Sequence, residues 1–520
     1  MATTKKIREN VSFEEFFNII VNRKISRKKR TVVLLIVILA TFILRLSYIG
    51  VPKLDRTSWK EIDYIEISKN FTKNNYNILE PTITWPAEPP RVTAMEFPLV
   101  PYAASILYYI FGFSTLTVRI LTLTAFLLTI VYVEKLTRIF LGQFISLLSA
   151  LFVAFLPVFH NYGNFLYSEP TLIAFSVMTL YYFTLFHLTG KKRNLIRAIV
   201  FFAIALLLKP TSLYLSLPVL YIFIYFSGLK IRTVAKFITV TMISIIPAVF
   251  WYSYAYYLTK NSIDVFGIFE GHDKFQTLNM LSSSYWYFKM KQNLFYMLGG
   301  YFGVLLLLTG VIALLLTKKG LVFIAYLTAI ASFFIIVAEG NIDGMYRHLT
   351  LTPPAAVMMA TGTVVGAIFL SRIFKKKFRY SFAISITLIV LTFGAVNFNK
   401  LDKSNINVWQ KYEWKIAEEI EKHIEKGDKI VTLGNYSIHK GGNDLSPVLY
   451  YYSGTTGWSL QKKDWDMTQF EELKNKGAKL IVCLHINREE GLRSFTRLIE
   501  KRYPKVFEDK ASSALIFLLN

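Results

Sequence analysis

The stretch "TVVLLIVILATFILRLSYIG", Thr31 to Gly50, decides the fold class of this chain. It is apolar over a length that crosses a hydrocarbon core of roughly 30 Å. The basic run "RKISRKKR", Arg23 to Arg30, lies directly before it, and such flanks stay on the cytoplasmic side of a membrane. A cleaved signal peptide is the alternative, but the apolar run is too long and no small-residue cleavage site follows it. The sequence therefore predicts a cytoplasmic segment, residues 1–30, followed by a membrane-spanning helix.

The composition extends this prediction to most of the chain. Of its 520 residues, 53% are hydrophobic and 16% aromatic, which is too apolar for a soluble enzyme of this length. The net charge of +25 is compatible with nucleic-acid binding, but the lysines and arginines concentrate in short connections between apolar runs. This is the pattern of the positive-inside rule. We therefore interpret the charge as membrane topology and expect no nucleic-acid partner.

Basic connections thread the later apolar runs alternately across the bilayer. The runs lie near residues 115–134, 140–160, 168–188, 195–209, 211–228, 234–258, 295–316, 320–338, 353–371 and 380–397. The basic markers lie at residues 134–138, 191–193, 230–232, 318–319 and 372–379. All of these markers fall on the cytoplasmic side only if the chain is still outside at residue 113.

This constraint decides how "EFPLVPYAASILYYIFG", Glu96 to Gly112, is interpreted. A crossing there would invert every later marker, so we expect a juxtamembrane helix along the outer interface, where its tyrosines are favoured. The transmembrane domain, residues 31–399, is then predicted to have about eleven spans and one large external loop, residues 51–114.

After about residue 400 the pattern becomes that of a soluble protein. A helical period in "WQKYEWKIAEEIEKHIEKGDK" is followed by the short buried-strand runs "KIVTLG", "AKLIVCL" and "SALIFLLN". The sequence predicts a polytopic α-helical membrane protein with a C-terminal soluble α/β domain, residues 400–520, outside the membrane. The single cysteine, Cys483, is expected in the core of that domain.

The external loop carries an unusual acidic stretch, "WKEIDYIEISKNF", which contains Glu61, Asp63 and Glu66. As a helix, it would place Trp59, Asp63 and Glu66 on one face. A carboxylate there can accept a proton from a hydroxyl or amine and so create a nucleophile beside a lipid-borne substrate. The alternative is a solvated amphipathic helix.

Further charged residues are expected near the same surface. Glu169, in "HNYGNFLYSEP", lies at a helix start, where an acid before proline commonly serves as a cap. Lys209 in "LLLKPTS" and Arg347 in "MYRHLTLTPP" are cations near the outer ends of spans, where they can reach a lipid-borne phosphate. Snorkelling to the interface is the alternative for both cations. Arg347 adjoins Tyr346 and His348.

The order of these features resembles a known family. The external acidic loop, "EFPLVPYAASILYYIFG", the acid before proline, "RHLTLTPP" and the C-terminal α/β domain look like the membrane glycosyltransferases of the GT-C superfamily. More narrowly, the chain resembles family 39, which includes protein O-mannosyltransferases and lipid A aminoarabinose transferases. The stretch "LYYYSGTTGWSL" also resembles a part of that family's soluble domain.

The resemblance implies roles for particular residues of the first loop. Lys60 to Asp63, followed by Asn70 and Phe71, is similar to an Arg-Gln-x-Asp pattern with a later Asn-Phe pair. Asp63 is then the implied catalytic base, although other branches place an Asp-Glu pair on Lys60 and Glu61, which keeps Glu61 as the alternative base.

The other motifs imply a substrate-binding set. Glu96 matches an acid at the end of the loop, and Phe97 stands where relatives carry a phosphate-binding lysine. Glu169 matches the acid of the second loop, and Arg347 matches the arginine of an Arg-Tyr-x-x-Pro pattern. The substrate-binding residues implied are Lys60, Glu96, Lys209, Tyr346, Arg347 and His348.

The resemblance implies transfer of one sugar from a polyprenyl-phosphate carrier to a lipid, glycan or protein acceptor at the outer face of the plasma membrane. Arg347 and Lys209 would stabilise the leaving phosphate. No cofactor is demanded, and a divalent cation bridging acids and phosphate stays possible. A secondary transporter and a non-catalytic membrane scaffold are the alternatives. A transporter would be expected to carry its charges inside broken helices, whereas the acids here lie in external loops.

Overall fold

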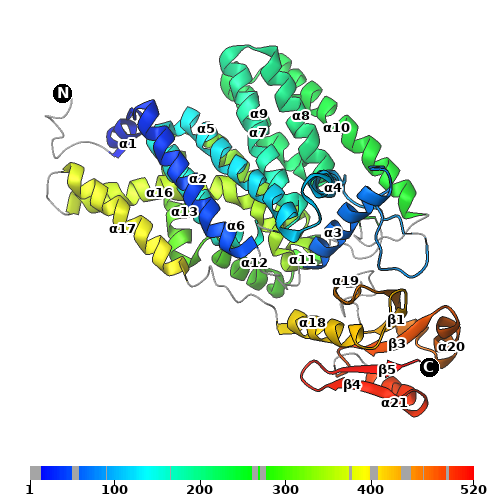
Figure 1. Cartoon of the computed structure of the whole chain (residues 1–520). Coiled ribbons are helices and arrows are strands. Elements are labelled where there is room, and N and C mark those ends of the chain that lie inside the picture. The colour runs from blue at the N-terminus through cyan, green and yellow to red at the C-terminus, as the bar shows by residue number, and fades with distance from the viewer. Residues whose placement is uncertain are drawn as a thin grey trace.

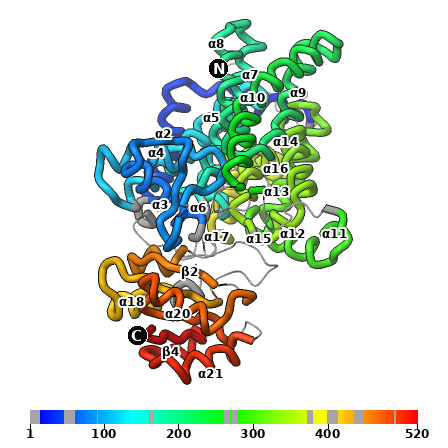
Figure 2. The backbone as a smooth tube through the Cα atoms, turned by 90° about the vertical axis from the view of Figure 1, so that its right-hand side faces the viewer, coloured from blue at the N-terminus to red at the C-terminus, as the bar shows by residue number. Residues whose placement is uncertain are grey.

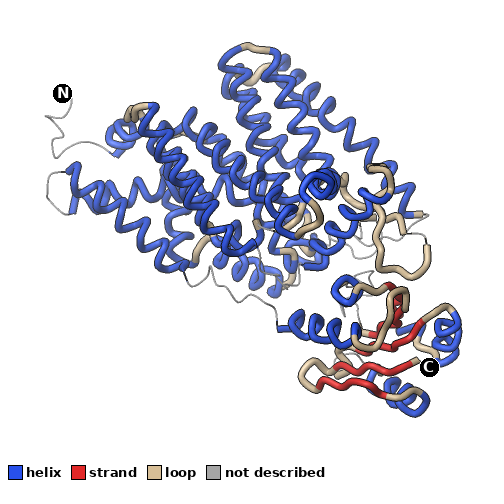
Figure 3. Tube along the Cα trace, in the orientation of Figure 1, coloured by secondary structure: helices blue, strands red, loops and turns tan. Residues whose placement is uncertain are grey.

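The computed structural model describes residues 13–49, 58–89, 91–163, 165–260, 268–269, 277–373, 378–398, 408–434, 447–460, 462–487 and 491–519. It consists of a large helical bundle and a smaller C-terminal domain that holds the β-sheet (Figures 1 and 3). Residues 50–57 and 399–407, where we expected the loop and the soluble domain to begin, lie outside the described residues.

The bundle is built from apolar helices of varied length. Its elements are α1 (Phe13–Val21), α2 (Arg27–Ile49), α3 (Ser58–Lys73), α4 (Leu99–Phe111), α5 (Thr115–Phe155), α6 (Pro157–Tyr162), α7 (Ser168–Thr189), α8 (Lys192–Leu208), η1 (Pro210–Leu215), α9 (Ser216–Ser227), α10 (Ile231–Thr259), α11 (Thr277–Leu281), α12 (Ser284–Met297), α13 (Gly300–Thr317), α14 (Leu321–Ile336), α15 (Gly340–Asp343), η2 (Met345–Leu351), α16 (Thr352–Ile373) and α17 (Phe378–Phe398).

Seven helices among the described residues are long and apolar enough to cross a membrane. They are Leu116–Phe155, Ser168–Thr189, Pro210–Ser227, Ile231–Thr259, Gly300–Thr317, Met345–Ser371 and Tyr380–Asn397. The chain is thus a polytopic helical membrane protein, as predicted, whereas the count of about eleven spans stays a prediction.

The longest helix, α5, is a hairpin of two helices that meet at Gly142. The backbone there has φ 78° and ψ 180°, which interrupts the helix. Ser146 donates a hydrogen bond to Glu134 Oε1 over 3.3 Å, although twelve residues of straight helix would separate their Cα atoms by roughly 18 Å. A Cβ at position 142 would lie 1.9 Å from the carbonyl oxygen of Val21, so only glycine fits this turn. The two spans expected over 115–134 and 140–160 are therefore two antiparallel helices.

The basic connections gather at one end of the bundle. Lys319 contacts the side chain of Asn18 on α1, and Arg30 lies 3.8 Å from Glu134. Helices α3, α6, α11 and α12 lie at the opposite end, next to the C-terminal domain (Figure 1). The connections at 134–138 and 318–319, which the threading assigned to one side, thus lie together beside the N-terminal helices. Which end is cytoplasmic stays a prediction.

The C-terminal domain is a five-stranded sheet covered by helices. Its elements are α18 (Val408–Glu421), β1 (Lys429–Leu433), α19 (Val448–Ser453), β2 (Thr456–Leu460), η4 (Lys462–Asp464), α20 (Met467–Asn475), β3 (Ala478–Cys483), α21 (Leu492–Arg502), β4 (Lys505–Asp509) and β5 (Ala514–Leu518). The strand order is β2-β1-β3-β5-β4, with β1, β2 and β3 parallel and the β3–β5 and β5–β4 pairs antiparallel. Cys483 is buried in this core, as expected.

The loop between α3 and α4 docks on the edge of this sheet. Gly457 of β2 donates a backbone hydrogen bond to Trp85 and accepts one from Ala87, over 2.9 and 3.0 Å. The rings of Trp85 and Tyr450 stack with centroids 5.5 Å apart. Strand β2 accordingly lies on the side of the domain that faces the bundle (Figure 2). The loop between α3 and α4 is thereby fixed to the C-terminal domain.

Candidate active site

Helix α3 carries the acidic stretch and buries it. Glu61, Asp63 and Glu66 are 4%, 4% and 6% exposed. The interpretation of α3 as a solvated amphipathic helix is therefore wrong. Carboxylates are rarely buried at this level without a partner or a task, so the surroundings of each one matter.

Glu61 is held by fixed partners. Arg119 of α5 donates to both of its carboxylate oxygens, over 3.3 and 3.1 Å, and the backbone N–H of Leu166 donates to Oε1 over 3.0 Å. This buried, bidentate ion pair ties α3 to the bundle. A carboxylate with these partners suits a structural role better than the role of a base.

The carboxyl group of Asp63, unlike that of Glu61, is not held by fixed partners among the described residues. Its Oδ1 atom is buried and has no hydrogen-bond partner within the part of the chain that the structure describes. Burial raises the pKa of this carboxyl well above its usual range, and the nearby Glu66 carboxyl raises it further. A carboxyl of this kind is a strong proton acceptor once it has lost its proton.

Glu66 lies one turn further along α3. It accepts a hydrogen bond from the backbone N–H of Thr84 over 3.2 Å. Burial raises the pKa of Glu66 to about 7, although the Thr84 N–H and the Lys69 ammonium act in the opposite direction.

Four charged side chains meet beside the first turn of α3. Lys60 Nζ lies 3.4 Å from Glu96 and 3.4 Å from Glu169, and Lys209 Nζ lies 3.8 Å from Glu96 and 2.5 Å from Glu169. Burial alone would lower the pKa of Lys60, but the Glu169 and Glu96 carboxylates outweigh burial and raise it, so the ammonium stays charged. The Lys60, Glu96 and Lys209 side chains keep 14%, 15% and 12% of their surface exposed, so the cluster is open to a ligand.

The aromatic ring of Tyr346 lies close to all three cations of this site. The Tyr346 centroid lies 5.2 Å from Lys60 Nζ, 5.5 Å from Lys209 Nζ and 5.7 Å from Arg347 Cζ. Tyr64 donates a hydrogen bond to Glu96 over 3.4 Å, and burial raises the pKa of its hydroxyl, which keeps it a donor. Hereafter the charged cluster means Lys60, Glu96, Glu169, Lys209, Tyr346 and Arg347.

The Arg347 side chain occupies space that two glycines leave open. A Cβ on Gly340 would lie 2.0 Å from Nη1 of Arg347, and one on Gly344 would lie 3.2 Å from Cδ. The guanidinium therefore lies directly on the backbone of α15. Among the described residues, no carboxylate is within ion-pair distance of Arg347.

His348 does not join the charged cluster. It is fully buried, with Nε2 2.7 Å from the Asn341 carbonyl oxygen and Nδ1 3.0 Å from the Met297 sulfur. The substrate contact expected for His348 does not fit this placement, because both ring nitrogens already face protein atoms.

Phe97 packs as an apolar residue, with its ring edge-on to Trp251 and the ring centroids 5.0 Å apart.

The structure thus gathers Lys60, Glu96, Glu169, Lys209, Tyr346 and Arg347 from five separate segments and sets Asp63 on the adjoining face of α3. Sequence reasoning missed Arg119 and Tyr64. A signal for Arg119 was present, because a charged residue inside an apolar span marks a buried partner or a site.

The described residues contain no group of three or more His, Cys, Asp or Glu side chains placed to hold a metal ion. Lys60 and Lys209 each pair with both Glu96 and Glu169. A divalent cation between these two acids stays untested.

Comparisons with known proteins bear on the fold of the chain. Residues 90–252 match the model of the family described as dolichyl-phosphate-mannose-protein mannosyltransferase. A search of curated protein sequences gave no match.

Solved structures give the fold of the whole chain. ArnT from Cupriavidus metallidurans in the apo state is 14% identical, has a TM-score of 0.60, and is matched over 94% of this chain and 98% of its own. The same ArnT bound to undecaprenyl phosphate is 13% identical, has a TM-score of 0.55, and is matched over 95% of this chain and 99% of its own. The apo oligosaccharyltransferase of Archaeoglobus fulgidus is 12% identical, has a TM-score of 0.54, and is matched over 95% of this chain and 75% of its own. The chain therefore has the fold of the GT-C membrane glycosyltransferases, and the resemblance inferred from the sequence is confirmed at that level.

The raised pKa of Glu66 predicts a pH dependence of stability. The folded protein holds a proton on Glu66 up to about pH 7, whereas the unfolded chain releases it near 4.5, so folding becomes less favourable as the pH rises through that window. The free energy of unfolding should fall by about 3 kcal/mol over this pH range in wild type. In Glu66→Gln this fall should disappear, because an amide does not titrate. The amide oxygen can still accept the hydrogen bond from the Thr84 N–H.

The measurement is the midpoint of unfolding in detergent from pH 4.5 to 8 for wild type and for Glu66→Gln. The control is Glu88→Gln, an exposed acid of the same loop that pairs with Lys476 over 3.2 Å. An identical pH dependence in wild type and Glu66→Gln would contradict the prediction.

Proposed function

We propose that this chain is a membrane glycosyltransferase that takes a monosaccharide from a polyprenyl-phosphate carrier and transfers it to a lipid, glycan or protein acceptor at the outer face of the plasma membrane. The observation that carries the proposal is the charged cluster, a partly open group of three cations and two acids in a protein with the GT-C fold. The match to ArnT bound to undecaprenyl phosphate supports a carrier of this chemistry.

The charges of the cluster suit such a donor. Lys60, Lys209 and Arg347 carry three positive charges, and Glu96 and Glu169 carry two negative charges, which leaves one positive charge uncompensated. A phosphodiester between a sugar and a polyprenol carries one negative charge. Transfer turns this group into a phosphate monoester with close to two negative charges. The cluster then interacts more strongly with the leaving group than with the donor, which favours the transition state.

Arg347 is the cation best placed for the phosphate. The two lysines already contact carboxylates, whereas Arg347 has no such partner in the described residues and presents a planar fork of donors to phosphate oxygens. Lys60 and Lys209 then pair with Glu96 and Glu169 and add positive charge around the same ring of Tyr346.

Asp63 is the proposed base. It lies one helical turn after Lys60, on the adjoining face of α3, and its Oδ1 accepts no hydrogen bond from the described residues. The acceptor hydroxyl or amine transfers its proton to Asp63 and attacks the anomeric carbon, the bond from that carbon to the phosphate oxygen breaks, and polyprenyl phosphate leaves with the bonding electrons. One displacement of this kind inverts the anomeric centre. Glu61, held by Arg119, would then keep α3 in place.

The C-terminal domain is proposed to help select the acceptor. Tyr451 of α19 lies over the ammonium of Lys69 on α3, 4.9 Å from its ring centre, and the domain is tied to the external loop through Gly457. The acceptor would approach α3 between these elements. We place the charged cluster and this domain outside the cell membrane and the basic end of the bundle in the cytoplasm, as the positive-inside rule implies.

The test is release of free polyprenyl phosphate by the full chain in nanodiscs. A panel of polyprenyl-phosphate sugars and nucleotide sugars is offered with a membrane extract as the source of acceptor. We expect one lipid-linked sugar to be consumed and no nucleotide sugar. Arg347→Gln should lose roughly a hundredfold or more in rate, because it removes a charge from the leaving-group site.

The control is Arg138→Gln, which removes an arginine that pairs with Glu134 over 3.6 Å at the opposite end of the bundle. This variant should keep the wild-type rate. Consumption of a nucleotide sugar, or an Arg347→Gln variant as fast as wild type, would contradict the proposal. If no donor turns over, saturable binding of undecaprenyl phosphate to wild type is measured, and its absence would also contradict the proposal.

A further inference from the structure

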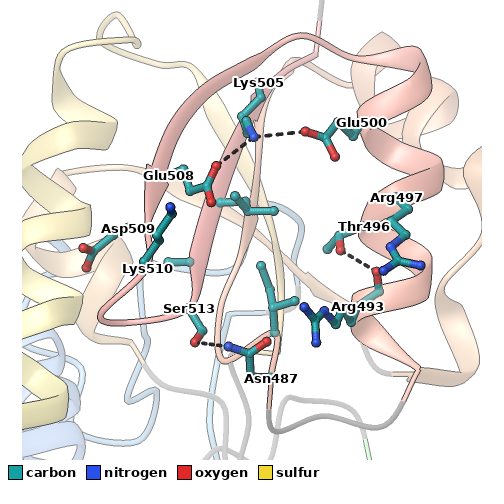
Figure 4. Close-up of a pocket in the computed structure, with 13 residues that line it drawn as sticks. Asn487, Arg493, Thr496, Arg497, Glu500, Lys505, Glu508, Asp509, Lys510 and Ser513 are labelled. Carbon is teal, nitrogen blue, oxygen red and sulfur yellow. Dashed lines mark hydrogen bonds and ion pairs between the residues drawn. The ribbon is translucent and has the colours of Figure 1, made fainter.

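A polar cavity of about 390 Å³ lies in the C-terminal domain, away from the charged cluster. It is formed by α21, by β4 and the turn that follows it, and by Ile486 and Asn487 after β3 (Figure 4). Helix α21 and strand β4 lie on the side of the domain that faces away from the bundle (Figure 1). The cavity therefore opens to the aqueous phase and not to the bilayer.

The acidic side chains at this cavity already have partners. Lys505 pairs with Glu500 over 3.0 Å and with Glu508 over 2.8 Å. Asp509 pairs with Lys415 over 3.4 Å and also accepts a hydrogen bond from a serine. Among the described residues these carboxylates form no ion pair with the remaining cations, although Lys505 and, to a smaller extent, the nearby Lys510 ammonium lower the pKa of the Glu508 carboxyl.

Three cations at the cavity lack such a partner. Arg493, Arg497 and Lys510 line it, and none of them forms an ion pair within the described residues. Arg493 and Arg497 are four residues apart on α21, so their like charges lie on one face and destabilise the helix by roughly 0.2–0.5 kcal/mol. Arg493 also lies in the first turn of α21, where the helix dipole disfavours a cation. An anion bound between the two guanidinium groups would remove both penalties.

Neutral polar groups complete the lining. Asn487 donates to the Ser513 hydroxyl over 2.7 Å, and Figure 4 shows this pair beside Arg493. The amide oxygen and the second N–H of Asn487 remain for a ligand. Thr496 also lines the cavity, but its hydroxyl already donates to the Arg493 carbonyl oxygen over 3.0 Å, so only its acceptor capacity is left for a ligand. Such groups suit the hydroxyls of a sugar or polyol.

We propose that this cavity is a binding site for a sugar-sized polyol that carries an oxyanion, a phosphate or a carboxylate, with Arg493 and Arg497 on the oxyanion and Asn487 on the hydroxyls. Arginine presents paired N–H donors that match both kinds of oxyanion. The volume lies within the roughly 300–1,000 Å³ of small-molecule sites. The site is separate from the charged cluster, so ligand binding here can be tested independently of the proposed transferase activity.

The test measures binding of glycerol 3-phosphate and of glucuronate to the full chain in nanodiscs, with glycerol and glucose as uncharged probes. We expect saturable binding of at least one anion, weakened by added salt, and no binding of the uncharged probes. Arg493→Ala with Arg497→Ala should weaken it about tenfold or more, because two charge-assisted hydrogen-bonding groups are lost. Comparison of the two anions distinguishes phosphate from carboxylate as the preferred group.

The matched control is Arg502→Ala, which removes an arginine of the same helix that pairs with Glu471 over 2.9 Å and does not line the cavity. It should leave the affinity unchanged. Absence of saturable binding of both anions would overturn the proposal, as would equal affinity in wild type and the double variant. An equal unfolding temperature of wild type and the double variant ensures that lost binding is not lost folding.

Discussion

The Asp63→Asn variant is expected to lose sugar transfer while keeping its fold. Removal of a general base typically costs a factor of about 10²–10⁴ in rate. Stability should be unchanged or slightly higher, because the carboxyl is buried and, within the described part of the chain, forms no ion pair and leaves Oδ1 without a hydrogen bond. The measurements are the initial rate of polyprenyl phosphate release and the unfolding temperature of the same preparation.

Glu61→Gln is the matched variant, since it makes the same chemical change two residues earlier on α3. It should be the less stable of the two, by about 3–5 kcal/mol, because it leaves the Arg119 guanidinium buried without its charged partner. A folded and inactive Glu61→Gln beside an active Asp63→Asn would assign the base to Glu61 and contradict our choice.

The pH dependence of the rate gives a second readout of the base. Burial and the nearby Glu66 carboxyl raise the pKa of Asp63, so the ligand-free enzyme holds this proton to a higher pH than an exposed aspartic acid does. The rate of wild type should therefore climb as the pH rises and Asp63 becomes able to accept a proton. The residual rate of Asp63→Asn should lack this rise.

The sequence predicted the bundle well because each of its signals is local. A span is a continuous apolar run flanked by basic connections, and both features are read without knowledge of the fold. The same signals predicted a connection between two antiparallel helices, but "EKLTR" placed it at Glu134 to Arg138, whereas the backbone turns at Gly142.

Whether the sequence predicted a strand of the C-terminal domain depended on its position in the sheet. β1, β3 and β5 were predicted from apolar runs, and all three have neighbours on both sides. β2 (Thr456–Leu460) and β4 (Lys505–Asp509) were missed, and both are edge strands. Edge strands bury less surface and carry Gly, Lys, Glu and Asp, so their sequences lack the signal of a buried strand.

The sequence predicted the candidate site only in part, because the site is formed by tertiary contacts. Motifs pointed to Lys60, Glu96, Glu169, Lys209 and Arg347 one at a time, but their convergence depends on tertiary contacts that no local pattern records. His348 was expected at the site because it follows Arg347. In the 3₁₀ helix η2 successive side chains are turned about 120° apart, so neighbours in sequence face different surroundings.

The Gly340→Ala variant is expected to impair transfer without destabilising the protein. Alanine in place of glycine within a helix usually stabilises by roughly 0.5–1 kcal/mol. The new Cβ would lie 2.0 Å from Nη1 of Arg347 and 3.2 Å from its Cζ. The end of a flexible side chain can move away, so the cost falls on the position of the guanidinium and not on the fold.

A displacement of about 1 Å at a group that stabilises the transition state can cost a factor of about 10² in rate. We therefore expect a loss of that order in polyprenyl phosphate release, with an unfolding temperature equal to wild type or higher. Gly394→Ala is the control, because a Cβ there meets no atom within 4 Å. It should leave the rate unchanged.

A double-mutant cycle with Arg347→Gln separates displacement of the arginine from any direct effect of the new methyl group. If Gly340→Ala acts through Arg347, it should have almost no further effect once the guanidinium is gone, so the two losses should not add. Additive losses would mean that position 340 contributes by another route. A fully active Gly340→Ala would mean that the phosphate does not depend on Arg347 in the position described, and the cationic role would then fall to Lys60 and Lys209, the two cations that share the Tyr346 ring.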